Sequence, residues 1–448
     1  MKTREEILTK ERLEYVRGIR NEAREATYTS IKDLIGEAAL AELRTLYDVF
    51  DEKIYIWLAG LWDNETGAFY YSNSARDTEL YRPDVESTVQ ALRFISNTGM
   101  LPVGEGNYTQ KIPTRMRDAV VKFIYALQDV DGYFYHPQWG KDVGVSRRGR
   151  DLGWSRQFLS EAGVTPKYLL PTQKTADGQK SKSLPEYLQT IDAFKEYLAA
   201  MDLSKNSYGI GNLIDSTCSQ ITAAGDEFKA YLIDWLDSQN RADNGLWEPQ
   251  INYASVNGLM KISGNYPHLH VNLKYPLKSL ESAIAAAMSD ERMKFVCEAY
   301  NPWVAIGNIF KANKDTPDLA ELEKLRAHLI DNAAALIKKT REKISVFRKP
   351  DGSYSYFKRM SACIAQGAPA AVPRTNEGDV NSTGICVSGT VRSMHNALCI
   401  PFVPIFTPED GKLFFELAEN NPPVKKLYKN PGGDKFPPRV PYEEEIAE

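Results

Sequence analysis

The sequence is poor in several features that mark particular classes of protein. Its first twenty residues are charged throughout and lack the apolar run of a secretory signal peptide. No stretch approaches the roughly 20 consecutive apolar residues of a membrane-spanning helix. The five cysteines are scattered, odd in number and without a Cys-x-x-Cys pair. A disulfide framework is therefore not expected. Together these absences predict a cytoplasmic protein with reduced thiols and no membrane partner.

An excess of positive charge is also lacking. The 448 residues include 55 Lys and Arg against 59 Asp and Glu, so the formal net charge is −4. This balance gives no electrostatic case for nucleic acid as a partner. The single basic clump, Arg147-Arg148-Gly149-Arg150, is interpreted as a solvated loop.

Strict two-residue alternation, the mark of a half-buried strand, is confined to short aromatic pieces. Helical periodicity dominates instead, with apolar residues at i, i+3, i+4 and i+7. The clearest examples are residues 30–61, 115–130, 225–240 and 319–344. The pattern predicts an all-α protein.

Four turns repeat one composition: an acidic residue, then glycine, then aromatic residues. They lie at residues 63–71, 131–135, 243–247 and 351–356. We expect the glycine to take a positive φ and the aromatic rings to close the end of a helix. Helices of smaller residues are expected to begin after three of these turns, at Asp84, Tyr253 and Asp379, with Asp215 as a further candidate start.

The string Asp-Val-x-Ser-Thr occurs twice, at residues 84–88 and 379–383. Asp, Ser and Thr are preferred helix N-caps because their side chains accept hydrogen bonds from free backbone N–H groups. The repeat is therefore interpreted first as two helix starts, with Asp84 and Asp379 as caps. A catalytic role for these two carboxyl groups stays open.

The recurring unit is thus an outer amphipathic helix, a glycine–aromatic turn and an inner helix. Such hairpins most economically close into a ring around a central cavity, an (α/α)6-type toroid. Over about residues 30–400 the pattern resembles the α/α-toroid superfamily, which terpenoid cyclases, protein prenyltransferases and many carbohydrate-active enzymes share. We expect three parts: a charged helix at 1–26, the toroid at 27–420 and an extended tail at 421–448.

Carboxylates form the first candidate site. Glu86 and Glu377 lie at two inner-helix starts, which face the same mouth of a toroid, and could serve as the acid and base of a glycosidase. The two copies of the repeat share neither glutamate. Asn381 stands where the first copy has Glu86, and Glu377 lies just before the repeated string. Arg374 precedes Glu377 and could bind a substrate carboxylate.

Tyr253, His268, Asn257 and His270 form a second candidate site. β-Elimination on a uronic acid needs a Tyr or His base, together with Asn, His or Arg to neutralise the developing enediolate. Arg76 is a further candidate for the carboxylate clamp. The alternative interpretation places the two histidines on an exposed loop and makes Tyr253 a packing residue. No third metal ligand accompanies the His-x-His pair at motif spacing.

Zinc is a third possibility. The resemblance to protein prenyltransferases implies a zinc site, and its candidate ligands in this sequence are Asp379, Cys386 and His395. Seven residues separate the first two, which places them on one helical face, whereas the nine residues to His395 do not. No metal and no cofactor is therefore expected.

Aromatic residues in turns form the last candidate set. Some should stack on a sugar, with polar neighbours binding its hydroxyl groups. The substrate-binding candidates of this kind are Tyr71, Tyr135, Trp139 and Trp247.

Taken together, the sequence predicts a cytoplasmic carbohydrate-active toroid, first of all a lyase that cleaves uronic-acid-containing glycans. The alternatives are a glycoside hydrolase, a terpenoid-cyclase or prenyltransferase-like enzyme, and a non-catalytic ligand-binding toroid. The sequence does not indicate the oligomeric state.

Overall fold

A computed structural model describes residues 2–170, 186–316 and 318–424. The chain is mostly helical, as predicted. Within the described ranges, its strands form two short antiparallel ladders, β1 (Trp62–Asp63) with β2 (Ala68–Phe69) and β3 (Ile364–Ala365) with β4 (Ala368–Pro369). None of the described helices combines the length and apolar character that crossing a membrane requires.

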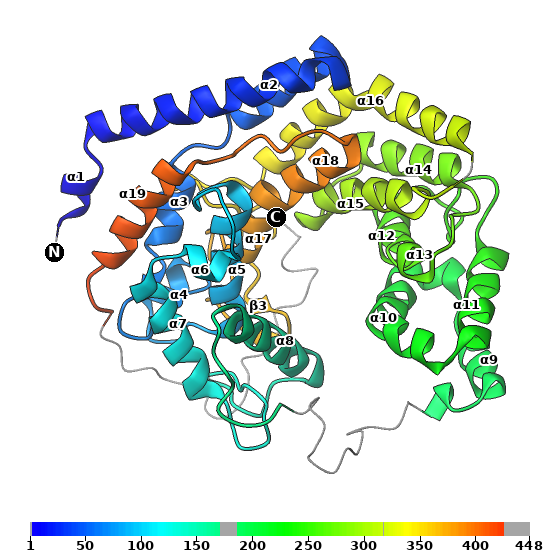
Figure 1. Ribbon diagram of the computed structural model, residues 1–448, viewed down its shortest axis with the longest axis horizontal. Helices are drawn as coiled ribbons and strands as arrows, with labels where there is room; N and C mark the ends of the chain where they lie inside the picture. The colour runs from blue at the N-terminus through cyan, green and yellow to red at the C-terminus, as the bar shows by residue number, and fades with distance from the viewer. Residues whose placement is uncertain (1, 171–185, 317, 425–448) are drawn as a thin grey trace.

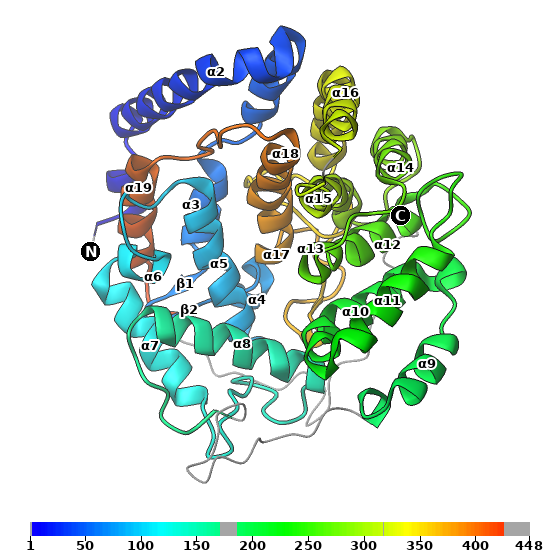
Figure 2. The same cartoon turned by 45° about the vertical axis from the view of Figure 1, so that its right-hand side comes forward.

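The longer helices lie in two layers (Figures 1 and 2). The peripheral helices are α2 (Lys10–Tyr47), α3 (Lys53–Ala59), α7 (Thr114–Leu127), α9 (Ile191–Ala199), α11 (Asp226–Gln239), α14 (Pro276–Met288), α16 (Leu319–Ser345) and α19 (Pro408–Glu419). The inner helices are α5 (Val85–Thr98), α8 (Val145–Glu161), α10 (Leu203–Ala224), α12 (Tyr253–Ser263), α15 (Cys297–Ala312), α17 (Val380–Gly384) and α18 (Thr390–Leu398), the last two joined by the π-helical turn η2 (Ile385–Gly389). The remaining elements are short: α1 (Arg4–Ile7), α4 (Asn73–Asp77), α6 (Tyr108–Lys111), the 3-10 turn η1 (Glu186–Leu188) and α13 (Tyr266–Leu269).

Inner helices pack against their neighbours in chain order. Helix α10 contacts α12, α12 contacts α15, and α15 contacts α18. Helix α17 contacts α5, which in turn contacts α8. Around the outside, α16 packs between α2 and α14. The chain from α8 to α10 passes through residues 171–185, outside the described residues.

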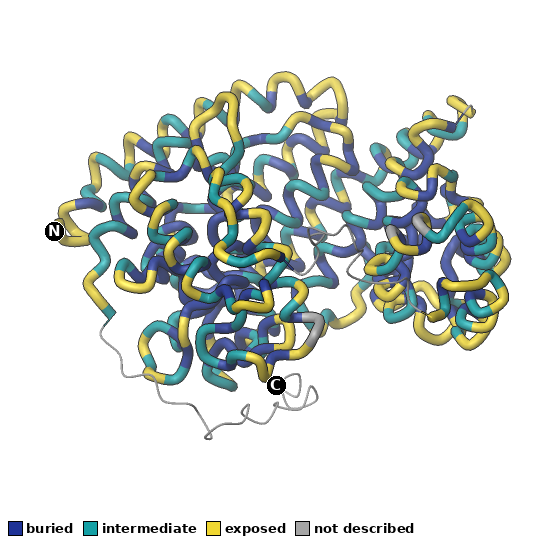
Figure 3. The backbone as a smooth tube through the Cα atoms, turned by 60° about the horizontal axis from the view of Figure 1, so that its bottom comes forward, coloured by how far each residue is buried: buried dark blue, intermediate teal, exposed yellow. Residues whose placement is uncertain are grey.

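The peripheral helices α2, α7, α11 and α16 bury one stripe and expose the other, as their periodicity predicts, and Figure 3 shows buried and exposed residues alternating along the backbone. Helix α2 shows this and also corrects the expected domain boundary. It runs through residue 26 without a break, and its one non-helical residue is Gly36, with φ of 79°. Arg20 on its buried stripe pairs with Asp410 of α19 at 2.7 Å. Of the expected N-terminal helix at 1–26, residues 4–7 form the separate short helix α1, and residues 10–26 are the first part of the longer helix α2. The expected tail lies, from residue 425 on, outside the described residues.

All four predicted glycine turns have the expected geometry. Their glycines have positive φ, at 71° for Gly67, 84° for Gly132, 68° for Gly245 and 91° for Gly352. The left-handed region is open to glycine at little cost, whereas a Cβ is disfavoured there. At Gly245 a Cβ would also overlap the backbone nitrogen of Ser279 on α14. These turns therefore let one hairpin pack closely against the next helix.

The repeated Asp-Val-x-Ser-Thr string joins each turn to its inner helix. The Thr88 hydroxyl accepts a hydrogen bond from the backbone N–H of Phe69 at 3.0 Å. In the second copy, Thr383 accepts one from Tyr354, also at 3.0 Å. The repeat is therefore shared scaffold. The candidate start at Asp215 is wrong, because this residue lies inside α10.

Replacing Gly245 tests the close packing of the turn. We expect Gly245→Ala to lower the free energy of unfolding by about 3 kcal/mol, from a disfavoured positive φ and the overlap with α14. Gly149 is helical with nothing near its Cβ position, so Gly149→Ala should raise stability by about 0.5–1 kcal/mol. Urea denaturation measures both, and equal effects of the two substitutions would contradict the account.

Candidate functional site

The helix starts that the repeat predicts, those of α5 and α17, lie next to each other. Asp84 Oδ1 accepts a hydrogen bond from the Ser87 N–H at 2.7 Å. Asp379 Oδ1 accepts one from the Ser382 N–H at 2.7 Å. Both aspartates are therefore N-caps, as expected, and both are buried. Their surroundings differ, and the difference defines the site.

Asp84 has a second set of partners. Its Oδ2 accepts hydrogen bonds from Arg147 Nη2 at 2.8 Å and from His136 Nε2 at 3.2 Å. His136 Nδ1 accepts from the Gln138 N–H at 3.2 Å, which leaves Nε2 as the protonated nitrogen. Burial lowers the pKa of His136, so the ring is a neutral donor. Burial opposes ionisation of Asp84, but Arg147 and His136 outweigh it and hold its pKa well below the ordinary value.

Arg147 is the cation at the centre of this network and is 1% exposed. Its Nε donates to Asp151 Oδ1 at 2.9 Å, and its Nη1 donates to the backbone carbonyl of Ala365 at 2.7 Å. One guanidinium thus serves two carboxyl groups. Burial raises the pKa of Asp151 to about 7, which the attraction of Arg147 only partly offsets. The solvated loop predicted at 147–150 is wrong, because this segment is the first part of α8.

A second ion pair lies on the same two helices. Arg150 Nε and Nη2 donate to the two carboxylate oxygens of Glu86 at 3.1 and 2.6 Å. Gln90 Nε2 donates both to Glu86 at 2.7 Å and to Asn381 Oδ1 at 3.2 Å. Gln90 Oε1 is buried and has no hydrogen-bond partner. An acceptor without a donor is costly in a folded chain, which makes it a candidate contact for a ligand hydroxyl.

A cavity of about 170 Å³ adjoins this second pair. It is lined by Tyr71, Gln90, Tyr356, Phe357, Ala362, Cys363, Ile364, Ala365, Gln366 and Asn381. One wall is the β3–β4 hairpin, whose turn residues Gln366 and Gly367 have φ of 50° and 84°. Trp139 Nε1 donates to the Pro369 carbonyl at 3.1 Å, and Arg147 holds Ala365 on the opposite strand. The charge network therefore fixes the cavity wall.

Asp379 does not line the cavity but lies beside Tyr71, which does. Burial raises its pKa to about 6, and hydrogen bonds to Ser382 and Ala362 limit the rise. The hydroxyl of Tyr71 is buried next to Asp379 and has no well-formed hydrogen bond. Burial and the Asp379 charge raise the pKa of Tyr71 well above its ordinary value. A carboxyl group that is partly protonated near neutral pH therefore lies one side chain from the cavity.

Glu377 holds a neighbouring segment of the chain in place. Its carboxylate accepts hydrogen bonds from the Ser72 hydroxyl at 2.9 Å and from the Ser74 N–H and hydroxyl at 2.7 and 2.5 Å. It thereby fixes the start of α4. Arg374 nearby is exposed, with φ of 60°, and does not line the cavity. The predicted pair Glu86 and Glu377 thus contributes one residue next to the cavity.

The Tyr–His candidates do not converge. Tyr253 begins α12, whereas His268 lies on α13 beyond the other end of that helix, and ten helical steps alone separate the ends by about 15 Å. His268 and His270 are both exposed. Asn257 is buried and accepts a hydrogen bond from Asn301 at 2.9 Å. This arrangement matches the alternative interpretation of exposed histidines.

The aromatic candidates divide between core, wall and surface. Tyr71 lines the cavity, and Trp139 supports its hairpin wall. Trp247 is a core residue whose indole donates to the Leu236 carbonyl at 2.8 Å. Tyr135 is half-buried at the surface, where its hydroxyl donates to Asp131 at 2.6 Å.

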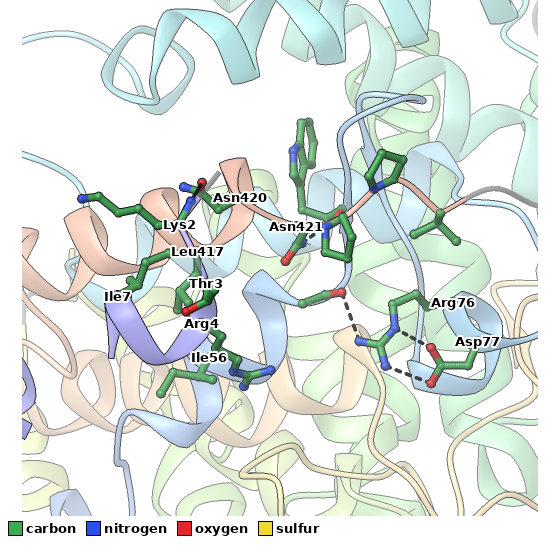
Figure 4. A pocket seen from close by; sticks show the side chains of 15 residues that line it. Lys2, Thr3, Arg4, Ile7, Ile56, Arg76, Asp77, Leu417, Asn420 and Asn421 are labelled. Atoms are coloured by element: carbon green, nitrogen blue, oxygen red, sulfur yellow. Dashed lines mark hydrogen bonds and ion pairs between the residues drawn. The ribbon is translucent and has the colours of Figure 1, made fainter. Parts of the chain in front are cut away.

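Arg76 lines a different cavity, of about 680 Å³, between the N-terminal residues, α3 and the end of α19 (Figure 4). It donates to the Gly60 carbonyl at 3.1 Å and pairs with Asp77 at 2.7 Å. Asp77 is the one carboxylate among the described lining residues. Acid–base chemistry with two carboxyl groups is therefore not available there.

No metal cluster forms at the third candidate. Within the described residues, no group of three His, Cys, Asp or Glu side chains is placed to hold a metal ion. His395 lies near the Tyr47 hydroxyl at 3.1 Å and the Pro401 carbonyl at 2.7 Å, while Asp379 caps α17.

Comparisons of the chain with protein-family models, curated proteins and solved structures find no match.

Sequence reasoning missed the residues that organise the cavity, namely His136, Arg147, Arg150, Asp151 and Gln90. A signal was present for three of them. Arg147 and Asp151 stand four residues apart, the spacing of an ion pair on one helical face. Gln90 stands at the same spacing from Glu86. The loop interpretation of 147–150 concealed the first of these signals.

The pKa of Asp151 predicts a specific pH dependence. The folded-state pKa of about 7 lies above the ordinary 3.8, so the contribution to stability is full below about pH 3.8 and is lost as the pH rises through 7. Between pH 6 and 8 the loss amounts to about 1–2 kcal/mol. Asp151→Asn should remove this dependence from the free energy of unfolding, measured by urea denaturation. The exposed control Asp142→Asn should keep it, and identical profiles for the two variants would contradict the assignment.

Proposed function

We propose that this protein is an α/α-toroid glycoside hydrolase whose active site is the cavity between α5, α17 and the β3–β4 hairpin. The toroid is inferred from the sequential packing of the inner helices and from the repeated turn that precedes α5, α12 and α17. In such a ring the inner helices start at one mouth. That mouth collects caps, charged side chains and loops where a ligand can reach them.

The observation that carries the proposal is a pair of carboxyl groups in opposite electrostatic environments next to one cavity. Asp379 has no cation among its close partners, and burial raises its pKa to about 6. Glu86 is ion-paired to Arg150 through both oxygens. A buried carboxyl group with a raised pKa can act as a proton donor, and one bonded through both oxygens to a guanidinium can act as the charged partner.

The lining of the cavity supports a sugar as the ligand. The amides of Gln90, Gln366 and Asn381 can bind hydroxyl groups, and the rings of Tyr71 and Tyr356 offer faces for stacking. A volume of about 170 Å³ is below the usual 300–1,000 Å³ of drug-sized sites, as expected for one sugar ring. A terpenoid cyclase would instead need a dry aromatic cavity that stabilises carbocations.

In this mechanism Asp379 gives its proton to the glycosidic oxygen by way of the Tyr71 hydroxyl, which lies between Asp379 and the cavity, as the bond to the sugar breaks. A water molecule then adds to the ring carbon and its proton returns to the Asp379 carboxylate by the same path. The carboxylate of Glu86 stabilises the positive charge that develops on the ring, and Gln90, bonded to Glu86, orients the sugar. The lyase alternative has less support, because Tyr253 and His268 lie apart. The Tyr71 hydroxyl is a poor base, since its raised pKa keeps it protonated.

Replacing Asp379 tests the proton donor. Asn caps helices as well as Asp does, so Asp379→Asn should keep the fold while it lowers kcat about 100-fold or more. The control Asp202→Asn changes the exposed N-cap of α10 and should leave kcat unchanged. The assay measures reducing ends released from soluble neutral and uronate-containing polysaccharides.

The same assay separates the alternatives. Activity should fall as the pH rises above about 6, because Asp379 then loses the proton that it donates. A rise in absorbance near ~230 nm with uronate polymers would mark an unsaturated product and favour the lyase. Release of no reducing ends from any polymer would overturn the hydrolase proposal.

A further inference from the structure

A second cavity, of about 280 Å³, lies next to the first, and Phe357 lines both. It is formed by residues 289–294 between α14 and α15, the last turns of α16 and residues 357–359. The proposed hydrolase reaction uses none of its side chains. The lining combines charge with apolar surface, including Met293, Val346 and Phe347.

Positive charge predominates around this cavity. The basic lining residues are Arg292, Lys294, Lys339, Lys343, Lys358 and Arg359. The acidic ones are Asp290, Glu291 and Glu342, and Asp290 is paired with Lys339. With six basic against three acidic groups, the cavity favours an anion. The phenylalanines and Met293 favour an apolar body on that anion.

Lys343 differs from the other lysines of the lining because it is buried, with 8% exposure. Its Nζ donates to the Ala287 carbonyl at 2.5 Å and lies 4.8 Å from the centre of the Tyr253 ring. Burial, helped by the neighbouring Lys339, lowers the pKa of Lys343 to about 8. A desolvated lysine beside a second cation is the usual form of an amine nucleophile.

Two further groups near Lys343 can take part in proton transfer. Burial raises the pKa of Glu298 to about 7, and its carboxyl group is close enough to influence both Lys343 and Tyr253. The Tyr253 hydroxyl is buried beside Ser289 without a well-formed hydrogen bond. A buried polar group without a partner is a second and independent sign of a ligand site.

We propose that this cavity binds a small anionic carbonyl compound, which Lys343 holds as an imine. The lone pair of the Lys343 nitrogen adds to the carbonyl carbon, and the carbonyl oxygen takes up a proton to become a hydroxyl group. A proton from Glu298 lets that hydroxyl leave as water, which leaves a C=N bond, and no electron is gained or lost overall. The protonated imine keeps one N–H, which can still donate to Ala287, so the support of α14 survives the reaction.

Pyridoxal 5′-phosphate is the probe for this site, because it joins an aldehyde, an aromatic ring and a phosphate. After reduction with borohydride at pH 7.5, peptide mapping identifies the labelled lysines. With a pKa near 8, Lys343 carries on the order of a hundredfold more free amine than an ordinary lysine. We expect it to be labelled at least about tenfold faster than exposed lysines such as Lys141. Labelling of Lys343 at or below the rate of Lys141 would overturn the proposal.

Two comparisons sharpen the test. Pyridoxal without the phosphate should label Lys343 several-fold more slowly, and equal rates would overturn the anionic part of the proposal. Lys343→Arg keeps a cation and hydrogen-bond donors but cannot form an imine, so the fast-labelling fraction should vanish. Lys349→Arg is the matched control, because Lys349 is also buried with a lowered pKa but lies outside the cavity lining. An equal loss in both variants would contradict the assignment.

Discussion

The buried guanidinium of Arg147 makes the contacts on which the wall of the candidate cavity depends. Its three nitrogens each donate to a different segment: Nη2 to Asp84 at the start of α5, Nε to Asp151 on α8, and Nη1 to Ala365 in the β3–β4 hairpin. A buried cation is costly unless it is paired and hydrogen-bonded, and here Nε, Nη1 and Nη2 each donate to a protein oxygen. The position of the hairpin, and with it the cavity wall, follows from this arrangement.

The repeated string around Asp84 and Asp379 shows how one scaffold supports two electrostatic states. Both aspartates cap an inner helix, and Thr88 and Thr383 attach both helices to the preceding turn. Arg147 then lowers the pKa of Asp84, whereas burial without a cation raises that of Asp379. The two aspartates are thus equivalent as helix caps but differ in pKa, and only Asp379 can hold a proton at a pH near 6.

Local signals in the sequence predicted the helices, the positive φ of the turn glycines and the two N-caps, because propensity and hydrogen bonding within a few residues determine these features. The arrangement of the candidate site depends instead on contacts between residues far apart in the sequence. Nothing local placed Arg147 beside Asp84, 63 residues away, or Gln90 beside Asn381. The separation of Tyr253 from His268 depended on where α12 ends, which is a tertiary outcome.

The central claim is that the cavity between α5, α17 and the hairpin holds the reacting sugar. The most direct measurement is a crystal structure of Asp379→Asn grown with an oligosaccharide that the natural protein degrades. We predict density for one sugar ring in the cavity, with hydroxyl groups bonded to Gln90 and Asn381. Density for the sugar elsewhere, with this cavity empty, would contradict the account.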